Sequence, residues 1–193
     1  MLALLLALTL TAPPRPTSAT LRKAFERNRE ALVEVRGPHH RGIGVLVGAQ
    51  GQVLTLTAYV GLEEATVQLE GEALPAKVLW ADAKVRLALL QLTTPRPCHA
   101  SAVRATDRFE PGEWLVGITR DSAGSPSPRL GRVLRGPTGK NAFIETDLMI
   151  SQGSPVFDDQ GRLLALSIGR SRAMPVVHVK RALLSLGRDE GAP

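Results

Sequence analysis

The sequence predicts an all-β domain, folded as a barrel or a sandwich, with one short helix before it. Beyond Ala31 the apolar residues come in short runs, separated by turn-forming dipeptides such as Gly37-Pro38, Pro111-Gly112 and Gly136-Pro137. The 193 residues are 44% hydrophobic, 22% charged and 4% aromatic, which is the composition of an ordinary globular protein. A chain of this size buries roughly 70% of its unfolded surface. It therefore needs no metal or disulfide to hold its core, and its lone Cys98 cannot form an intrachain disulfide.

The N-terminus carries an apolar run from Leu2 to Ala12, which is too short to cross a bilayer and is typical of a secretory signal. The small residues of Thr17-Ser18-Ala19 fit a cleavage site, so we expect residues 1–19 to be removed and the protein to be exported, periplasmic or secreted, in a bacterium. No Lys or Arg precedes the run. Two alternatives therefore stay open, a start codon further upstream and a retained segment that would contact the membrane.

The elements follow in order along the chain. Thr20 to about Glu30 is expected to form a helix, because Leu21, Phe25 and Leu32 lie near one face of it. Lys180 to Leu186 is expected to form a closing helical turn that ends at Gly187. Between them we predict strands at Ala31–Val35, Gly44–Val47, Val53–Thr57, Ala65–Leu69, Ala76–Trp80, Leu87–Leu92, Trp114–Ile118, Leu130–Val133, Ala142–Glu145, Ser154–Phe157, Leu163–Ile168 and Pro175–Val179.

A series of short motifs accompanies these strands in a fixed order. They are GIGVLV (42–47), GQVLT (51–55), AKVLWAD (76–82), LALLQL (87–92), PGEWLVGI (111–118), LGRV (130–133), ETD (145–147), GSPVF (153–157) and DQGRL (159–163). Their order and spacing resemble bacterial trypsin-like serine proteases of the HtrA (Deg) type. The resemblance implies a double β-barrel of the trypsin-like (chymotrypsin) fold over residues 20–187, with the first barrel at about 31–95 and the second at about 105–187. We expect no PDZ module after it and a frayed tail at 188–193.

The three catalytic positions of that family carry unsuitable residues here. By the resemblance, the histidine position falls on Ala58, the aspartate position on Arg86 and the nucleophile position on Gln152. An alanine cannot accept a proton, a guanidinium cannot stabilise an imidazolium, and a carboxamide is not a nucleophile. Ile150 replaces a glycine of the family's oxyanion hole, and a β-branched residue resists backbone angles that only glycine adopts. The sequence therefore predicts a pseudoprotease.

An active enzyme is the alternative, since Ser151 or Ser154 becomes a candidate nucleophile if the alignment shifts by one residue or so. Either serine needs a base. The four histidines of the chain are His39, His40, His99 and His178, and none falls at the end of the third predicted strand. Cys98 and His99 are neighbours on an extended linker, where their side chains point to opposite sides, so they make a poor dyad. The pair His39-His40 has no carboxylate or Cys close by in sequence, so we expect a solvated loop and no metal site.

A barrel without catalysis can still bind a polypeptide at an exposed strand edge. By the resemblance, Ile168, Gly169 and Arg170 would pair with a bound peptide, and Ala173 and Met174 would wall the adjoining pocket. The alternative for this segment is a solvated turn. On the binding interpretation, Arg170 and Arg172 would favour acidic residues in the peptide.

The net charge of +6 and pI of about 10.2 support a further alternative, a basic module for anionic envelope polymers. The Lys and Arg residues are spread through the chain with few aromatic residues to stack on bases, so nucleic acid is not expected. We expect a polypeptide or partner protein as the ligand, and no cofactor.

Overall fold

The computed structural model describes residues 15–104, 106, 108–121, 123–139 and 142–180, and within them an almost entirely β architecture. Helix α1 (Ser18–Asn28) leads into a 3-10 turn, η1 (Arg29–Ala31), and a second such turn, η2 (Thr57–Tyr59), follows the third strand. The strands are β1 (Leu32–Arg36), β2 (Arg41–Gly48), β3 (Gln52–Leu56), β4 (Glu64–Leu69), β5 (Glu72–Asp82), β6 (Leu87–Leu92), β7 (Trp114–Arg120), β8 (Pro126–Arg135), β9 (Ile144–Thr146), β10 (Pro155–Phe157), β11 (Leu163–Gly169) and β12 (Arg172–Pro175).

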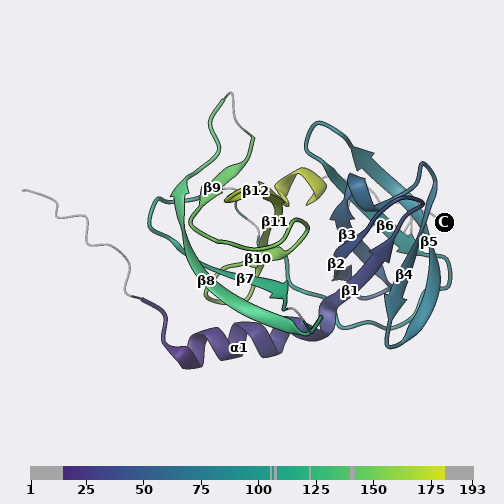
Figure 1. Cartoon of the computed structure of the whole chain (residues 1–193), viewed down its shortest axis with the longest axis horizontal. Helices are drawn as coiled ribbons and strands as arrows, with labels where there is room; N and C mark the ends of the chain where they lie inside the picture. The colour runs from purple at the N-terminus through teal and green to yellow at the C-terminus, as the bar shows by residue number, and fades with distance from the viewer. Residues whose placement is uncertain (1–14, 105, 107, 122, 140–141, 181–193) are drawn as a thin grey trace, which may run out of the picture.

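The strands form two closed antiparallel barrels that stand side by side (Figure 1). The first barrel has the strand order β1-β2-β3-β6-β5-β4 and closes where β1 pairs with β4. The second has the order β10-β11-β12-β9-β8-β7 and closes where β10 pairs with β7. The predicted all-β double barrel with a short N-terminal helix is therefore confirmed.

The apolar residues explain why the barrels pack against each other. In β6 the run Leu87–Leu90 is fully buried, so this strand faces apolar neighbours on both sides. The core of the first barrel continues into side chains of the second, including Ile118, Phe157 and Met174. A separate cluster around Leu115, Ile144 and Leu164 fills the second barrel. The two barrels thus share a continuous apolar interface, which fixes the relative positions of the loops between them.

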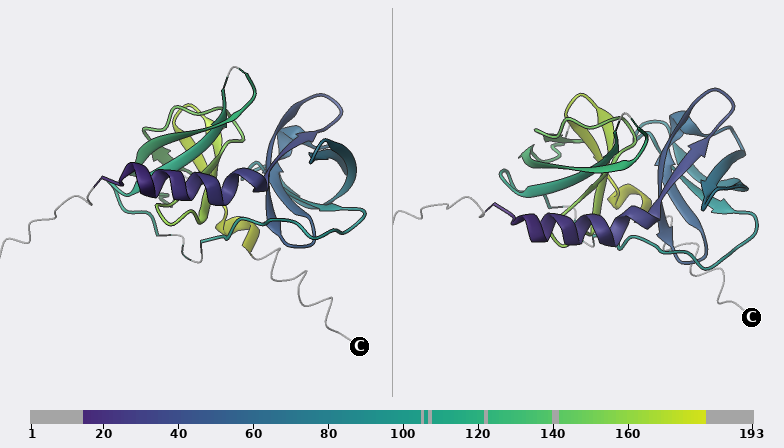
Figure 2. Two further views of the ribbon diagram at one scale, coloured as in Figure 1. Left: turned by 90° about the horizontal axis from the view of Figure 1, so that it is seen from below. Right: turned by 60° about the horizontal axis from the view of Figure 1, so that its bottom comes forward.

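Helix α1 runs along the second barrel and leads into the first, as both views in Figure 2 show. Thr17 caps its N-terminus by accepting a hydrogen bond from the backbone N–H of Thr20. At the other end Asn28 is fully buried. Its amide donates to the carbonyls of Ala24 and Gly161 at 2.9 Å, and its Oδ1 accepts from Ser101 Oγ at 2.7 Å. One side chain therefore links the helix, the β10–β11 turn and the interbarrel linker.

Several predicted boundaries differ from the observed ones, and that of the last strand differs in a way that affects the site. The last strand, expected at Pro175–Val179, is observed as β12 at Arg172–Pro175, and a helical segment already begins at residue 177. The reason is the tight turn at Arg170 and Ser171, which returns the chain into the sheet earlier than expected. The predicted signal segment falls mostly on residues 1–14, which lie outside the described residues, as do most of the closing turn at 180–186 and the tail.

The proposed cleavage point after Ala19 lies in the first turn of α1, because the helix begins at Ser18 and not at Thr20. Among the described residues, no helix combines the length and the apolar character that crossing a bilayer requires.

Candidate functional site

The positions matched to the family's histidine and aspartate lie together at the end of β3. Ala58 is the middle residue of η2, and its side chain is exposed. The backbone N–H of Thr57 donates to the carbonyl of Arg86 at 3.0 Å, which holds the start of β6 against η2. Arg86 has a φ of +61°, a left-handed conformation that is uncommon for residues other than glycine. Its Nη1 reaches the carbonyl of Ile168, in the second barrel, at 3.4 Å.

Tyr59 brings the third position, Gln152, to the same place. The hydroxyl of this half-buried tyrosine donates to the Gln152 carbonyl at 3.1 Å, so a side chain from the first barrel holds the loop before β10. Two glycines make room for the ring. A Cβ at Gly42 would lie 2.1 Å from Tyr59 Cε2, and a Cβ at Gly153, where φ is +82°, would lie 2.8 Å from the same atom. Ala58, Arg86 and Gln152 are therefore gathered where the barrels meet.

The electrostatics of the junction keep Tyr59 a hydrogen-bond donor. Burial raises the pKa of its hydroxyl above the ordinary value of 10.0, and the nearby Arg86 cation lowers it in part. The phenol is therefore protonated at neutral pH and can donate to a carbonyl. A protonated phenol is also a poor base. The junction thus contains a protonated phenol at Tyr59 and a guanidinium at Arg86.

The two candidate serines differ sharply in accessibility. Ser151 is exposed, and its Oγ accepts a hydrogen bond from Thr119 Oγ1 at 3.1 Å. Ser154 is completely buried, and its Oγ has no hydrogen-bond partner among the residues that the structure describes. A buried hydroxyl cannot meet a substrate, so within this conformation Ser151 is the better placed of the two.

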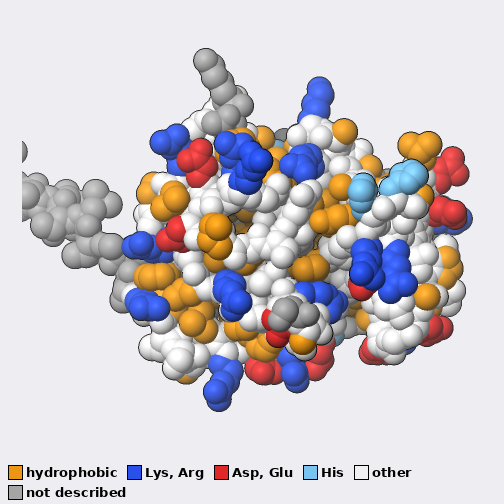
Figure 3. Space-filling view, in the orientation of Figure 1, with side chains coloured by type: hydrophobic (Ala, Val, Ile, Leu, Met, Phe, Trp, Pro, Cys, Tyr) orange, Lys and Arg blue, Asp and Glu red, His pale blue; other side chains and the backbone are white. Residues whose placement is uncertain are grey.

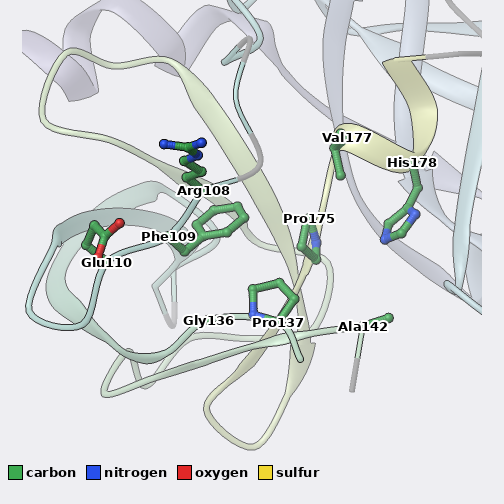
Figure 4. A pocket seen from close by; sticks show the side chains of 9 residues that line it. All are labelled: Arg108, Phe109, Glu110, Gly136, Pro137, Ala142, Pro175, Val177 and His178. Atoms are coloured by element: carbon green, nitrogen blue, oxygen red, sulfur yellow. The ribbon is translucent and has the colours of Figure 1, made fainter. Parts of the chain in front are cut away.

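The histidines are positioned away from these serines. His39 and His40 are exposed in the turn between β1 and β2. His99 Nε2 lies 2.7 Å from the carbonyl oxygen of Arg27, to which it donates. His178 lines a cavity of about 410 Å³ with Phe109, Pro137, Pro175 and others, drawn in Figure 4. Among the described residues, no histidine hydrogen-bonds to Ser151 or Ser154.

The Cys98-His99 pair is not a dyad in the structure. The Cys98 thiol donates to the Arg96 carbonyl at 3.2 Å, whereas the neighbouring ring of His99 bonds to α1. Burial raises the pKa of this thiol, which disfavours the reactive thiolate. The prediction of a linker segment agrees with these contacts.

Ile150, at the oxyanion position, packs against the second barrel. A Cβ at Gly117 would lie 2.9 Å from Ile150 Cδ1, so the absence of a side chain at Gly117 accommodates the isoleucine. The non-glycine residues with positive φ in the described chain are Glu70, Arg86, Arg170 and Ser171, and Ile150 is not among them. Its backbone therefore keeps an ordinary conformation.

The predicted peptide-binding residues fall into two groups. β11 continues past its partner β10, so Ile168 and Gly169 lie at the open end of a strand and are half-buried, and Arg170 is exposed in the turn that follows. Ala173 and Met174 are instead 2% and 3% exposed and belong to the barrel cores. Neither side chain lines the cavity at His178 or the cavity beside Ser151 and Arg170.

A cavity of about 360 Å³ adjoins this strand end and the Gln152 loop. It is bordered by β7, β8 and the β11–β12 turn, and its lining is rich in arginine and hydroxyl groups: Thr119, Arg120, Arg129, Leu148, Met149, Ile150, Ser151, Arg170 and Ser171. Among the residues that the structure describes, no aspartate or glutamate lines this cavity. The cavity is therefore bordered by arginine and hydroxyl side chains beside the part of β11 that extends past β10.

Comparison with known proteins identifies the family. A family model described as "Trypsin-like peptidase domain" matches residues 42–166, which is more than half of the chain. The chain belongs to the trypsin-like peptidase family. It is 28% identical over 122 residues to the periplasmic pH-dependent serine endoprotease DegQ of Escherichia coli K12, an alignment that covers 58% of this chain and 27% of DegQ. The chain thus spans about a quarter of that relative, and the predicted HtrA-type resemblance is confirmed at the level of the protease domain.

The fold has a counterpart among solved structures. The crystal structure of the serine endoprotease from Yersinia pestis superposes with a TM-score of 0.73 at 21% identity, covering 92% of this chain and 69% of that one. At this level of identity the match concerns the fold. It agrees with the double barrel described above.

Sequence reasoning missed several residues of the site. Tyr59 was not singled out, although it is the chain's single tyrosine and directly follows the histidine position. Arg120 and Arg129 were also missed, because they lie far from Arg170 in sequence and meet it only at the cavity. Arg172, expected in the turn, lies in β12 with its guanidinium 4.6 Å from the centre of the Phe143 ring.

Proposed function

We propose that this chain is a pseudoprotease of the cell envelope, a trypsin-like domain that binds an extended polypeptide without cleaving it. The observation that carries the proposal is the gathering of Ala58, Arg86 and Gln152 at the barrel junction. Contacts there connect η2 with Arg86, and Tyr59 with the Gln152 carbonyl. A shifted alignment would have to bring other groups to this place, and two contacts across the barrels already occupy it, from Tyr59 to the Gln152 carbonyl and from Arg86 to the Ile168 carbonyl.

The chemistry of those side chains supports a loss of hydrolysis. Acyl transfer by a serine protease needs a nucleophile, a base that takes its proton and a group that orients the base. A methyl group, a guanidinium and a carboxamide supply none of these functions. Ser151 is accessible, but its side chain hydrogen-bonds to the hydroxyl of Thr119, which is not a general base near neutral pH.

The open end of β11 supports the binding half of the proposal. An extended peptide can add to a strand edge through main-chain hydrogen bonds, while neighbouring pockets select its side chains. Gly153 N–H already donates to the Ser167 carbonyl at 2.7 Å, and Ser167 N–H donates to the Ser154 carbonyl at 2.8 Å. These bonds fix β11 up to Ser167. Beyond it the side of β11 that faced β10 has no paired strand among the described residues, while β12 pairs with the other side. The open edge is short, because Gly169 has a φ of +91° and is not extended.

The envelope location rests on two observations. The N-terminal segment of this chain is apolar up to Ala12. The relative DegQ is described as periplasmic. We therefore expect the domain to act outside the cytoplasm on exported polypeptides.

Activity is tested by incubating the purified chain with casein and with a fluorophosphonate probe, next to Ser151→Ala and Ser154→Ala variants. The proposal expects no cleavage and no label in any of the three proteins. Cleavage or labelling that disappears in Ser151→Ala would instead identify a divergent serine endopeptidase and overturn the pseudoprotease assignment.

Binding is tested separately by calorimetry with extended peptides taken from exported proteins. We expect saturable binding that Gly169→Pro weakens, because proline cannot adopt the φ of +91° of Gly169 and so displaces the end of β11. Urea unfolding of the same variant controls for a loss of folding. If the peptides show no saturable binding to the wild-type chain, the binding half of the proposal is wrong.

A further inference from the structure

We propose that the 360 Å³ cavity beside the Gln152 loop receives an acidic side chain, Glu or Asp, of the bound polypeptide. This inference rests on the proposed polypeptide-binding function and names the class of sequence that the domain selects. The groups that would recognise the carboxylate are Arg120, Arg129 and Arg170. They replace the predicted pair of Arg170 and Arg172, because Arg172 stacks on Phe143 instead.

The first argument is an excess of unpaired positive charge. Arg120 ends β7, Arg129 lies in β8 and Arg170 lies in the β11–β12 turn, so three separate segments bring a guanidinium to one cavity. Among the residues that the structure describes, none of the three forms a salt bridge with a carboxylate. Like charges around one cavity repel each other, and an anion removes that repulsion.

The second argument is that two of these guanidinium groups are held in place and still have free donors. Arg120 Nη1 donates to the Gly124 carbonyl at 2.8 Å, and Arg129 Nη1 donates to Ser127 Oγ at 2.9 Å. Both contacts lie within the β7–β8 hairpin. A guanidinium has five N–H groups, so the remaining ones are available for a carboxylate, which it can bind through two parallel hydrogen bonds.

The rest of the lining fits a short acidic side chain. Of the hydroxyl groups in the lining, that of Ser151 accepts a hydrogen bond from Thr119 and can still donate its own proton to a carboxylate. Met149 is 80% exposed at the cavity, and its sulfur accepts a hydrogen bond from Ser171 Oγ at 3.6 Å. Its exposed methylene groups offer an apolar contact for the stem of a glutamate side chain.

The third argument comes from the backbone of the turn that presents Arg170. Arg170 and Ser171 have φ values of +51° and +59°, a pair of left-handed conformations that join β11 to β12 through a two-residue turn. Such turns favour Asn-Gly or Asp-Gly. A residue pair that destabilises its own turn is often retained for function, and strained positions cluster at ligand sites. The exposed guanidinium of Arg170 is the feature that a more stable turn sequence would lose.

The position of the turn connects the cavity with the strand edge. Arg170 directly follows Ile168 and Gly169, so a peptide lying along this edge passes the cavity mouth. Side chains of an extended peptide alternate in direction, and every second one would point to the same side. Figure 3 shows Lys and Arg side chains spread over both barrels among apolar and uncharged surface, and not in one continuous patch on this face. That distribution favours recognition of one side chain over binding of an anionic polymer.

The test uses the full chain and three pools of fluorescein-labelled nonapeptides, in which the central residue is Glu, Gln or Lys and the flanking positions are mixtures of Ala, Val, Ser and Thr. Fluorescence anisotropy measures the dissociation constant. We expect the Glu pool to bind about tenfold more tightly than the Gln pool, the effect of one charge-assisted hydrogen bond, and the Lys pool to bind least tightly. The Glu preference should shrink as salt concentration rises.

The informative variant is Arg170→Asn, which gives the turn a residue that tolerates the left-handed conformation. It should raise the midpoint of urea unfolding and still abolish the Glu preference, so misfolding cannot explain the loss. Arg129→Gln should reduce the preference as well. Arg22→Gln is the matched control, since it removes the same charge from an exposed site on α1 and should leave the preference unchanged.

The other outcomes are distinct. If all three pools bind equally well and Arg170→Asn changes nothing, this inference is overturned while the proposed peptide-binding function stands. If no pool binds saturably, the proposed function itself fails. If dextran sulfate binds and none of the peptide pools does, the basic surface recognises anionic polymers, and both the inference and the proposed function are wrong.

Discussion

Replacing Tyr59 by phenylalanine isolates the hydrogen bond that joins the two barrels at the candidate site. The ring stays in place over Gly42 and Gly153, and only the hydroxyl contact with the Gln152 carbonyl is removed. The net value of a hydrogen bond of this kind is about 0.5–1.5 kcal/mol, and half-burial places the expected loss in the lower part of that range. Urea unfolding followed by tryptophan fluorescence measures this loss of stability. The dependence of the unfolding free energy on urea concentration should stay unchanged, because the same surface is exposed on unfolding.

The packing of the ring is tested by Gly42→Ala. Its new methyl group would lie 2.1 Å from Tyr59 Cε2 and 2.3 Å from Cζ, so ring and strand must move apart. Overpacking of this kind costs about 1–3 kcal/mol. The cost should largely vanish in a Tyr59→Ala background, where the space is empty. If the stability losses of the two single variants instead add up to that of the double variant within about 0.5 kcal/mol, the placement of the ring over Gly42 is refuted.

The same hydroxyl gives a pH dependence with a definite sign. The folded-state pKa of Tyr59 is raised above the ordinary value of 10.0, so the folded chain holds this proton more tightly than the unfolded chain. The contribution to stability is therefore fully present below about pH 10 and is lost as the pH rises through the folded-state pKa. Wild type should lose stability relative to Tyr59→Phe above about pH 10. A constant difference between the two proteins over that range would contradict the raised pKa.

Two further substitutions test the framework of the site. Asn28→Ala removes three hydrogen bonds of a fully buried side chain and leaves the Ser101 and Gly161 partners unsatisfied. The free energy of unfolding should therefore fall by about 2–4 kcal/mol. The control is Glu26→Ala, an exposed position on the same helix, which should change the free energy of unfolding by less than about 0.5 kcal/mol. Ser154→Ala removes a buried hydroxyl that has no partner among the described residues, so the free energy of unfolding should stay the same or rise by about 1 kcal/mol. A clear fall in the free energy of unfolding would show that the hydroxyl is hydrogen-bonded.

The fold could be predicted from the sequence because its signals are local. The strand at Leu87–Leu92 was placed at its observed bounds, since an uninterrupted apolar run between polar turns has few other interpretations. The last strand was displaced because Pro175 to Val179 has the apolar character of a strand, whereas the observed turn at Arg170 and Ser171 lacks the glycine that marks such turns. Local preference was overruled there by the pairing of β12 with β11 and β9.

The candidate site could be predicted only in part. Ala58, Arg86 and Gln152 were assigned from motifs whose neighbours are recognisable, and their match to the catalytic positions stays a prediction. Tyr59 has no such context, since its role depends on a carbonyl 93 positions away in the chain. Arg120 and Arg129 belong to the β7–β8 hairpin. Closure of the second barrel places this hairpin beside the Gln152 loop, and the spacing of residues along the chain does not reveal that contact.

The contacts at the degenerate positions also bear on how the proposed binding edge would work. Arg86 Nη1 and the Tyr59 hydroxyl both run from the first barrel to backbone carbonyls of the second, at Ile168 and Gln152. In an active triad the serine and the histidine exchange a proton during turnover, whereas a donor bonded to a carbonyl holds the loop in one conformation. An edge that is ordered before the peptide arrives loses less conformational entropy on binding. These contacts would therefore favour a rigid acceptor strand, and Tyr59→Phe should weaken peptide binding as well as stability.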